Sequence, residues 1–485
     1  MTEIAGIVKD VWADDIKTVG AGRTPIMSRL PLSRGLASLG GVYHQPVMLA
    51  YEGSFTTAPG GTAVGTATNP YNRPIAGSVP DAEMTPYQFG ARSRIDYEAI
   101  ARTANALLGT SDFNLDSTEN NTKKAVKAAS ATTMESLGLG TAKKVEILAL
   151  HGQRTLGIIE SIETSSRSGN YNGVAGNYRQ VSITPSSWSR GLWSRQQRSA
   201  FDVVTLSGAT PTKTSSAANT LLGNNETGLI LTAVSPSTQR TGVNAQAYTD
   251  NRVLEFWHTA TTNGIDALAV DSGLVFEGCV VGSTWQEMPG LTIFGRNTGT
   301  LFAINAETFD LWRGNIFDAA GNINLASLID YCAALPDFDC MSELVTAIVP
   351  SRYYMKVASD EAALRRYSGD YFAQNLARSV QAREGEQQRG QAMNGFGGRL
   401  MFGMDGDNTL ELLSHPYQKQ GEILVYVPSE TKRVGAQDIS TASKGGSRMV
   451  LESADAPSSE IRVFGSFVNY VECPRHCISI TGITY

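Results

Sequence analysis

The residues Lys144-Val-Glu-Ile-Leu-Ala-Leu-His-Gly152 have the pattern of the end of a helix. Val145, Leu148 and Ala149 recur at helical spacing among them. Gly152 stands where glycine commonly ends a helix. The spacing therefore predicts a helix that ends at Gly152, before the strand-like residues that follow.

The same helix extends upstream in the sequence. Asp116-Ser-Thr-Glu119 offers N-capping residues, so we expect the helix to begin near them. Gly138 and Gly140 are expected to break or kink it, because glycine weakens a helix interior. Residues 96–152 are therefore predicted to be the main helical region.

The composition excludes several classes of protein. The chain has 485 residues, of which 41% are hydrophobic and 18% are charged, with a net charge of -6. This balance is typical of a folded chain without a globally basic surface for nucleic acid. No apolar run approaches the ~18 residues of a membrane helix. The first residues lack the apolar segment of a signal peptide, so we expect the chain to fold in the cytoplasm. The five cysteines are an odd number, so we expect reduced thiols and not a set of disulfides.

Two segments before the helix have little apolar surface of their own to bury. Residues 1–41 read as a nearly charge-balanced arm, which we expect a neighbouring subunit to hold. Residues 42–95 read as an extended β-hairpin, in which Tyr43–Tyr51 leads out and Thr85–Ile95 leads back. This hairpin contains no lysine.

The region after the helix is predicted to be rich in strands. Residues 153–310 contain short apolar runs divided by turn residues, and we expect these runs to be strands: Phe201–Leu206, Leu229–Val234, Val253–His258, Gly273–Val281 and Leu291–Phe294. Residues 164–180 and 207–225 read as polar loops. The rest combines helices and strands, which gives an α+β class with a long β-rich insertion. In residues 311–397 we expect a helix at 324–335 that Asn324 caps, further helices at 359–367 and 371–389, and a strand at 344–349. In residues 398–485 we expect strands at 399–402, 411–413, 422–427, 461–471 and 478–483.

No catalytic or cofactor motif is present, so we predict no catalytic, cofactor-binding or metal-binding residue and no enzyme activity. Cys473-Pro-Arg-His-Cys477 resembles a metal cluster, but no second Cys/His pair lies nearby. Packing at a strand end is the favoured interpretation of this cluster. His415 is likewise interpreted as a structural histidine, because no nucleophile motif accompanies it.

One aromatic and basic cluster could stack nucleic-acid bases. It consists of Trp188 and Trp193 with Arg190, Arg195 and Arg198. Core packing or a subunit contact is the favoured interpretation of its tryptophans.

The order of these elements resembles the major capsid protein of tailed bacteriophages, the Hong Kong 97-type fold. The stretch that ends at Gly152, followed by Gly157-Ile-Ile159, resembles the end of the family's spine helix. Leu410–Pro416 with Gly421–Pro428 resembles its late strand pair, and Phe467–Pro474 with Ile478–Ile483 resembles its closing strands. The resemblance implies an N-terminal arm (1–41), an extended loop (42–95), a helical region with the spine helix (96–152), a peripheral and β-rich insertion region (153–310), an axial domain (311–397) and return strands (398–485).

The resemblance implies a structural protein that assembles into hexamers and pentamers of an icosahedral shell around double-stranded DNA, without sequence-specific binding. It would assemble in the host cytoplasm and reside in the virion. Its partners would be neighbouring capsomers, a separate scaffolding protein, a portal and a cement protein. An encapsulin-like compartment shell and a phage tail or baseplate protein remain alternatives, as does a secreted β-rich glycan-binding protein or hydrolase.

Some relatives join subunits through a lysine of the extended loop, and the absence of lysine here predicts that this crosslink is not made. A fused scaffolding segment is also not expected. Removal of residues 1–35 is expected to leave a soluble subunit that forms no closed shell. Inter-subunit contacts are expected at charged and aromatic residues of the arm and the loop: Trp12, Arg23, Arg29, Arg34, Tyr51, Phe55, Tyr71, Arg73, Tyr87 and Phe89.

Overall fold

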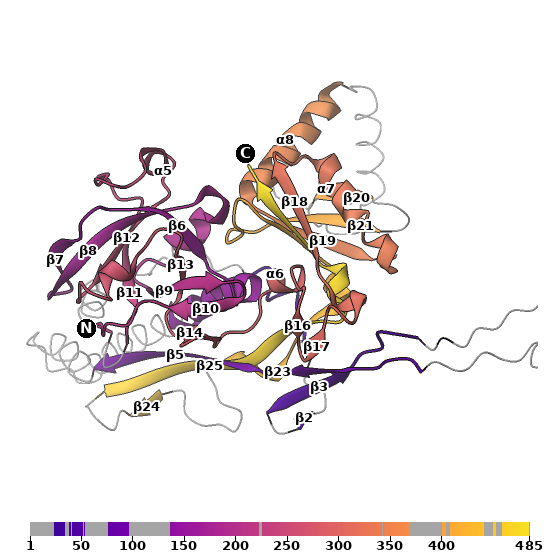
Figure 1. Cartoon of the computed structure of the whole chain (residues 1–485), viewed down its shortest axis with the longest axis horizontal. Helices are drawn as coiled ribbons and strands as arrows, with labels where there is room; N and C mark the ends of the chain where they lie inside the picture. The colour runs from indigo at the N-terminus through magenta and orange to yellow at the C-terminus, as the bar shows by residue number, and fades with distance from the viewer. Residues whose placement is uncertain are drawn as a thin grey trace, which may run out of the picture.

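The fold is mixed and sheet-rich, with few helices among the described residues. Figure 1 shows a β-barrel, a long ribbon-like sheet that runs beneath it, and a third body in which helices pack on a sheet. A computed structural model describes residues 24–33, 38–39, 41–51, 53, 76–96, 136–222, 226–341, 343–367, 400–403, 408–440, 450–452 and 458–484.

A helix that is described over residues 136–151 lies where the three bodies meet. It ends as predicted, and the Gly152 amide donates to the Leu148 carbonyl at 2.7 Å. The expectation that Gly138 and Gly140 break it is wrong, because the helix continues through both. Burial of the next turns explains this continuity, since all six residues 145–150 are at most 8% exposed.

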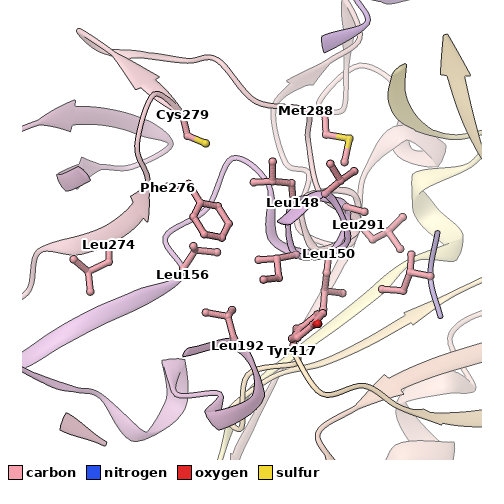
Figure 2. Packing of buried hydrophobic residues seen from close by; sticks show 14 of the residues in the cluster. Leu148, Leu150, Leu156, Leu192, Leu274, Phe276, Cys279, Met288, Leu291 and Tyr417 are labelled. Carbon is pink, nitrogen blue, oxygen red and sulfur yellow. The ribbon is translucent and has the colours of Figure 1, made fainter. Parts of the chain in front are cut away.

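The β-barrel consists of six strands in the order β9-β11-β12-β8-β6-β13, and β13 pairs back with β9 to close it. Its core is continuous with that of the helix end and the ribbon sheet. Figure 2 shows Phe276 of the barrel and Leu156 between Leu274 of the barrel and Leu148 and Leu150 of the helix. The elements of this region are β6 (Gly157–Ile162), β7 (Arg167–Tyr171), β8 (Val174–Ile183), η1 (Pro185–Ser187), α4 (Arg190–Ser194), β9 (Ala200–Ser207), β10 (Thr210–Lys213), β11 (Leu229–Val234), α5 (Ala245–Thr249), β12 (Val253–His258), η2 (Ile265–Ala267), β13 (Gly273–Phe276), β14 (Val280–Val281), β15 (Thr284–Trp285) and α6 (Leu291–Phe294).

Three expectations for this region are wrong. Residues 164–180 are not a polar loop, because β7 and β8 form a hairpin around Asn172 and Gly173, whose φ values of 50° and 80° suit a tight hairpin turn. Residues 207–225 include the strand β10, which pairs with β9. Leu291–Phe294 is the short helix α6, because so short an apolar run does not distinguish a helix from a strand.

The ribbon sheet is built around β25, which pairs with β5, β23 and β24. The expectation that Thr85–Ile95 leads back along the outgoing strand is wrong. The outgoing strand β3 pairs with β4 instead, and β5 leaves the hairpin to pair with β25 over ten residues. The elements are β1 (Leu32–Ser33), β2 (Ser38–Leu39), β3 (Val42–Pro46), β4 (Asp81–Met84), β5 (Tyr87–Asp96), β23 (Thr431–Ser440), β24 (Val450–Glu452) and β25 (Ser458–Val471).

The third body is a six-stranded sheet in the order β18-β26-β22-β19-β21-β20, with α7 and α8 packed on it (Figure 1). Asn324 caps α7 as predicted, accepting from the Ser327 amide at 2.7 Å. The helix α8 starts directly after Pro350, earlier than predicted, because proline suits the start of a helix. The predicted helix at 371–389 lies outside the described residues. The elements are β18 (Asn315–Gly321), α7 (Leu325–Cys332), β19 (Leu344–Val349), α8 (Ser351–Tyr367), β20 (Leu400–Gly403), β21 (Thr409–Ser414), β22 (Ile423–Tyr426) and β26 (Ile478–Ile483), with the smaller β16 (Thr300–Leu301), β17 (Ile304–Asn305), η3 (Asp310–Trp312), η4 (Pro336–Phe338), η6 (Pro428–Glu430) and η7 (Pro474–His476) nearby.

Residues 415–422, the junction loop, connect β21 to β22 and pack against the helix end and the base of the barrel. The Tyr417 carbonyl lies 3.1 Å from His151 Nε2. The Gly421 amide donates to the Ser186 carbonyl at 2.9 Å. A Cβ at Gly191 would lie 2.2 Å from the carbonyl oxygen of Pro416, so this approach requires glycine.

We expect Gly191→Ala to lower the free energy of unfolding by about 2–4 kcal/mol, because the added methyl group overlaps backbone that other bonds hold in place. Urea denaturation measures the loss. Gly140→Ala is the matched control, since a Cβ there has no neighbour within 4 Å. Alanine in a helix interior should stabilise by about 0.5–1 kcal/mol. Equal stabilities of the two variants would contradict the proposed close contact.

Candidate functional site: the anchored segment and the projecting hairpin

The N-terminal segment of residues 24–33 is anchored on the buried carboxylate of Glu146. The backbone amides of Ile26 and Met27 donate to its two oxygens at 2.8 and 3.0 Å. His415 Nε2 lies 2.9 Å from the same carboxylate, while His415 Nδ1 accepts from the Tyr417 amide at 3.2 Å. These partners fit a neutral imidazole that donates through Nε2. They give His415 the structural role that the sequence predicted for it.

A second anchor joins this segment to the six-stranded sheet. The Arg29 guanidinium makes two hydrogen bonds of 2.8 and 3.0 Å to the carboxylate of Glu411, whose side chain is 1% exposed. Burial lowers the pKa of Arg29, but its bonds to the Glu411 carboxylate outweigh that effect and raise the pKa above its ordinary value. The Arg29 guanidinium therefore stays positively charged at all physiological pH values.

A third anchor is the short parallel pairing of β1 with β23. The Arg433 amide donates to the Pro31 carbonyl at 2.8 Å, and Arg433 Nε donates to the Leu30 carbonyl at 2.9 Å. Ile26 and Leu30 are at most 1% exposed. The expectation that a neighbouring subunit holds the arm is therefore wrong for residues 24–33, which their own chain holds. Removal of residues 1–35 would also remove part of the core.

The hairpin of β3 and β4 projects from the body, where Figure 1 labels β3 at the lower right. Its described residues beyond the paired strands expose apolar side chains. Met48 is 60% exposed, Tyr51 is 83% exposed and Val79 is 54% exposed. Exposed apolar groups on a projecting element are typical of a surface that another molecule covers.

The structure places four of the ten predicted contact residues. Arg29 is paired inside the chain, Tyr51 is exposed on the hairpin, and Tyr87 and Phe89 are half-buried on β5. Phe89 packs on Phe467 with ring centroids 5.0 Å apart. Their role between subunits stays a prediction. Six of the ten lie outside the described residues: Trp12, Arg23, Arg34, Phe55, Tyr71 and Arg73.

Glu146 and Glu411 were not predicted from the sequence as anchors. Glu146 is an isolated acid within an apolar run, which is an unusual place for a carboxylate and was an available signal. Glu411 sits on β21 between apolar neighbours in the same way. Nothing in the sequence indicates that their partners lie more than a hundred residues away.

A cluster of charges joins the junction loop to the barrel and to α6. Arg154 makes two hydrogen bonds of 3.0 and 2.8 Å to Glu422, Arg296 Nη2 lies 3.5 Å from Glu422, and Lys419 Nζ donates to the Thr155 carbonyl at 2.7 Å. Burial alone would raise the pKa of Glu422, but Arg154 and Lys419 hold it well below its usual value. Burial lowers the pKa of Lys419 to about 7, helped by the charge of Arg154 and opposed by Glu422.

The two other clusters that the sequence singled out are packing features. Trp188 and Trp193 are buried in the core, at 2% and 0% exposure, so they cannot stack bases. His476 Nδ1 lies 2.8 Å from the Glu430 carboxylate, and Cys473 Sγ donates to the Leu311 carbonyl at 3.5 Å. Among the described residues, no group of three or more metal-ligating side chains comes together, and no helix there is long and apolar enough to cross a membrane.

Comparison with solved structures finds phage capsids along the whole chain. The capsid asymmetric unit of Cyanophage A-1(L) is 11% identical over 98% of both chains, with a TM-score of 0.42. The capsid structure of Cyanophage P-SCSP1u is 8% identical over 98% of this chain and 94% of its own, with a TM-score of 0.39. A structure of Mycobacterium phage Bobi is 10% identical over 100% of this chain and 98% of its own, with a TM-score of 0.39. No family model and no curated protein matches the chain.

We expect Glu146→Gln to lower the free energy of unfolding by about 2–4 kcal/mol, because an amide cannot accept from all three buried donors. The amides of Ile26 and Met27 should also exchange with solvent faster. Urea denaturation and amide hydrogen exchange measure the two effects. Glu472→Gln, at a carboxylate that is 52% exposed, is the control and should change stability by less than about 0.5 kcal/mol. Unchanged exchange at Ile26 would contradict the anchoring role.

We expect Lys419 to make a contribution to stability that rises with pH between 7 and 9. The unfolded chain keeps a lysine proton up to about pH 10, whereas folded Lys419 loses it near pH 7, so at this residue the unfolded state holds more protons in this window. The free energy of unfolding of the unaltered protein, relative to that of Lys419→Met, should therefore gain up to about 1.4 kcal/mol per pH unit. Burial raises the pKa of several cysteine thiols, which act in the opposite direction but equally in both proteins. Lys432→Met, at a lysine paired on the surface, should keep the pH dependence of the unaltered protein. Equal slopes in all three proteins would refute the argument.

Proposed function

We propose that this chain is the major capsid protein of a tailed bacteriophage, with a Hong Kong 97-type fold and no catalytic activity. The observation that carries the proposal is an apolar hairpin that projects from a body whose N-terminal segment is locked in place. Met48, Tyr51 and Val79 lie exposed on it, while Glu146 and Glu411 anchor the neighbouring segment. A subunit of this shape gains stability by covering the hairpin with another copy.

The proposed division of the chain follows the family: arm 1–41, extended loop 42–95, helical region 96–152, peripheral and β-rich insertion 153–310, axial domain 311–397 and return strands 398–485. The six-stranded sheet with α7 and α8 corresponds to the axial domain. The ribbon of β5 and β25 corresponds to the long arm of the peripheral domain.

The mechanism is one of packing rather than chemistry. Copies of the chain would form hexamers and pentamers through neighbouring arms and loops, and these would close into an icosahedral shell around double-stranded DNA. The net charge of -6 suits a wall that does not hold DNA by its overall charge. A separate scaffolding protein, a portal and a cement protein are the proposed partners, with assembly in the host cytoplasm and residence in the virion. An encapsulin-like compartment or a tail protein is not favoured.

We expect the double variant Met48→Asp, Tyr51→Asp to yield folded subunits that form no closed particles, because charges on the hairpin prevent its burial against a neighbour. Electron microscopy and gradient sedimentation of the assembly reaction measure this. Val270→Asp is the control, since Val270 is 50% exposed on the barrel and away from the hairpin. Normal shells from the double variant, or tubes and rings from the unaltered protein, would overturn the proposal.

A further inference from the structure

The barrel carries a surface groove beside the loop that connects β6 to β7. The groove has a volume of about 570 Å³. One wall is the loop after β6, with Thr164, Ser165 and Ser166, and the other is the apolar segment of residues 268–270 after η2. Arg179 of β8 and Asp266 of η2 also line it. Its size lies within the range of small-molecule sites.

Both walls are held by backbone hydrogen bonds, so the groove does not need to be formed by a ligand. The Thr164 amide donates to the Thr241 carbonyl at 2.9 Å. On the other wall, the Asp271 amide donates to the Ile159 carbonyl at 2.9 Å. A groove with preformed walls binds without the entropic cost of ordering them.

Arg179 supplies unused hydrogen-bond donors inside the groove. Arg179 is only 9% exposed. Its Nε donates to the Glu163 carbonyl at 3.0 Å, and its Nη1 donates to Asp266 Oδ1 at 3.2 Å. Its Nη2 has no hydrogen-bond partner within the part of the chain that the structure describes. A nearly buried guanidinium with a free nitrogen facing a groove indicates a place for an acceptor on a ligand.

The charges and hydroxyl groups narrow the class of ligand. Asp266 pairs with Arg179, so the groove is close to neutral and favours no net anion. The side chain of Asp266 is 46% exposed and leaves its second oxygen open as an acceptor. A donor and an acceptor side by side match two adjacent hydroxyl groups, and Val270, which is 50% exposed, offers an apolar contact for a ring of C–H groups.

We propose that this groove binds a neutral saccharide, with Arg179 and Asp266 bonded to adjacent hydroxyl groups, Ser165 and Ser166 bonded to others, and Val270 packed on the sugar ring. The proposal does not depend on the assembly function, because every residue in it belongs to the barrel. On a capsid, such a groove would let the particle adhere weakly to a glycan-coated surface, with many copies acting together.

The test is binding of the full chain, in its assembled form, to a microarray of bacterial and plant glycans, followed by titration of the best neutral oligosaccharide. We expect binding that is insensitive to salt. Ala269→Trp, which fills the exposed groove, should weaken it at least about tenfold, and Asp266→Asn should weaken it about tenfold, as expected for a hydrogen bond to a charged group.

Ala175→Trp, at an exposed alanine near the tip of the β7–β8 hairpin, is the matched control and should bind like the unaltered protein. Sedimentation of each variant confirms that the assembly is intact. Three results would overturn the proposal: no glycan is bound, only acidic glycans are bound and salt abolishes the binding, or Ala269→Trp binds as well as Ala175→Trp.

Discussion

The junction loop packs against the base of the barrel and holds the three bodies of the structure together. Main-chain atoms of residues 416–421 touch main-chain atoms of residues 186–191 so closely that neither Gly191 nor Gly421 has room for a side chain. The same loop carries His415 to Glu146 and Glu422 to Arg154. One connection between two strands therefore sets the position of the barrel, the helix end and the N-terminal segment at the same time.

This arrangement explains why polar groups are buried at the centre of the molecule. Apolar contacts alone would join the three bodies but would allow them to slide against one another. Glu146 accepts three hydrogen bonds that form in only one geometry, so it fixes the N-terminal segment and the junction loop relative to the helix. Arg29 and Glu411 fix the same segment a second time. In the closed shell that we propose, the angle between the parts of each subunit would have to be defined, because angular errors of neighbouring subunits would add up around the shell.

Features set by local sequence were predictable, and those set by distant partners were not. The end of the helix at Gly152, the cap of α7 by Asn324 and the short strands β9, β11 and β12 follow from spacing and turn residues. The pairing of β5 with β25 joins segments more than three hundred residues apart, which no local pattern encodes. The β7–β8 hairpin was missed although Asn172-Gly173 is a strong turn signal, because the polar residues around it suggested a loop.

The features of the candidate site also fall into those that the local sequence predicts and those that depend on distant partners. The exposure of Tyr51 agrees with a hairpin that has too little apolar surface to fold on its own. The anchoring of residues 24–33 was predicted in the wrong place, since an arm with scattered apolar residues gives no sign that Ile26 and Leu30 enter a core of their own chain. Burial depends on the fold of the whole chain. The charged residues of the arm indicated an exposed segment, so the burial of its apolar residues was not predicted.

The barrel, the helix end and the ribbon sheet share one continuous core, which limits how the barrel can change in evolution. An appended domain with its own core can be lost or exchanged between lineages through one deletion at its boundaries. This barrel cannot be removed by one such deletion, because Leu148 and Leu150 of the helix pack in one core with Phe201 and Leu274 of the barrel. A lineage that lost the barrel would have to replace the exposed half of that core in the same step. The barrel should therefore be inherited with the wall, while its outer groove and loops remain free to diverge.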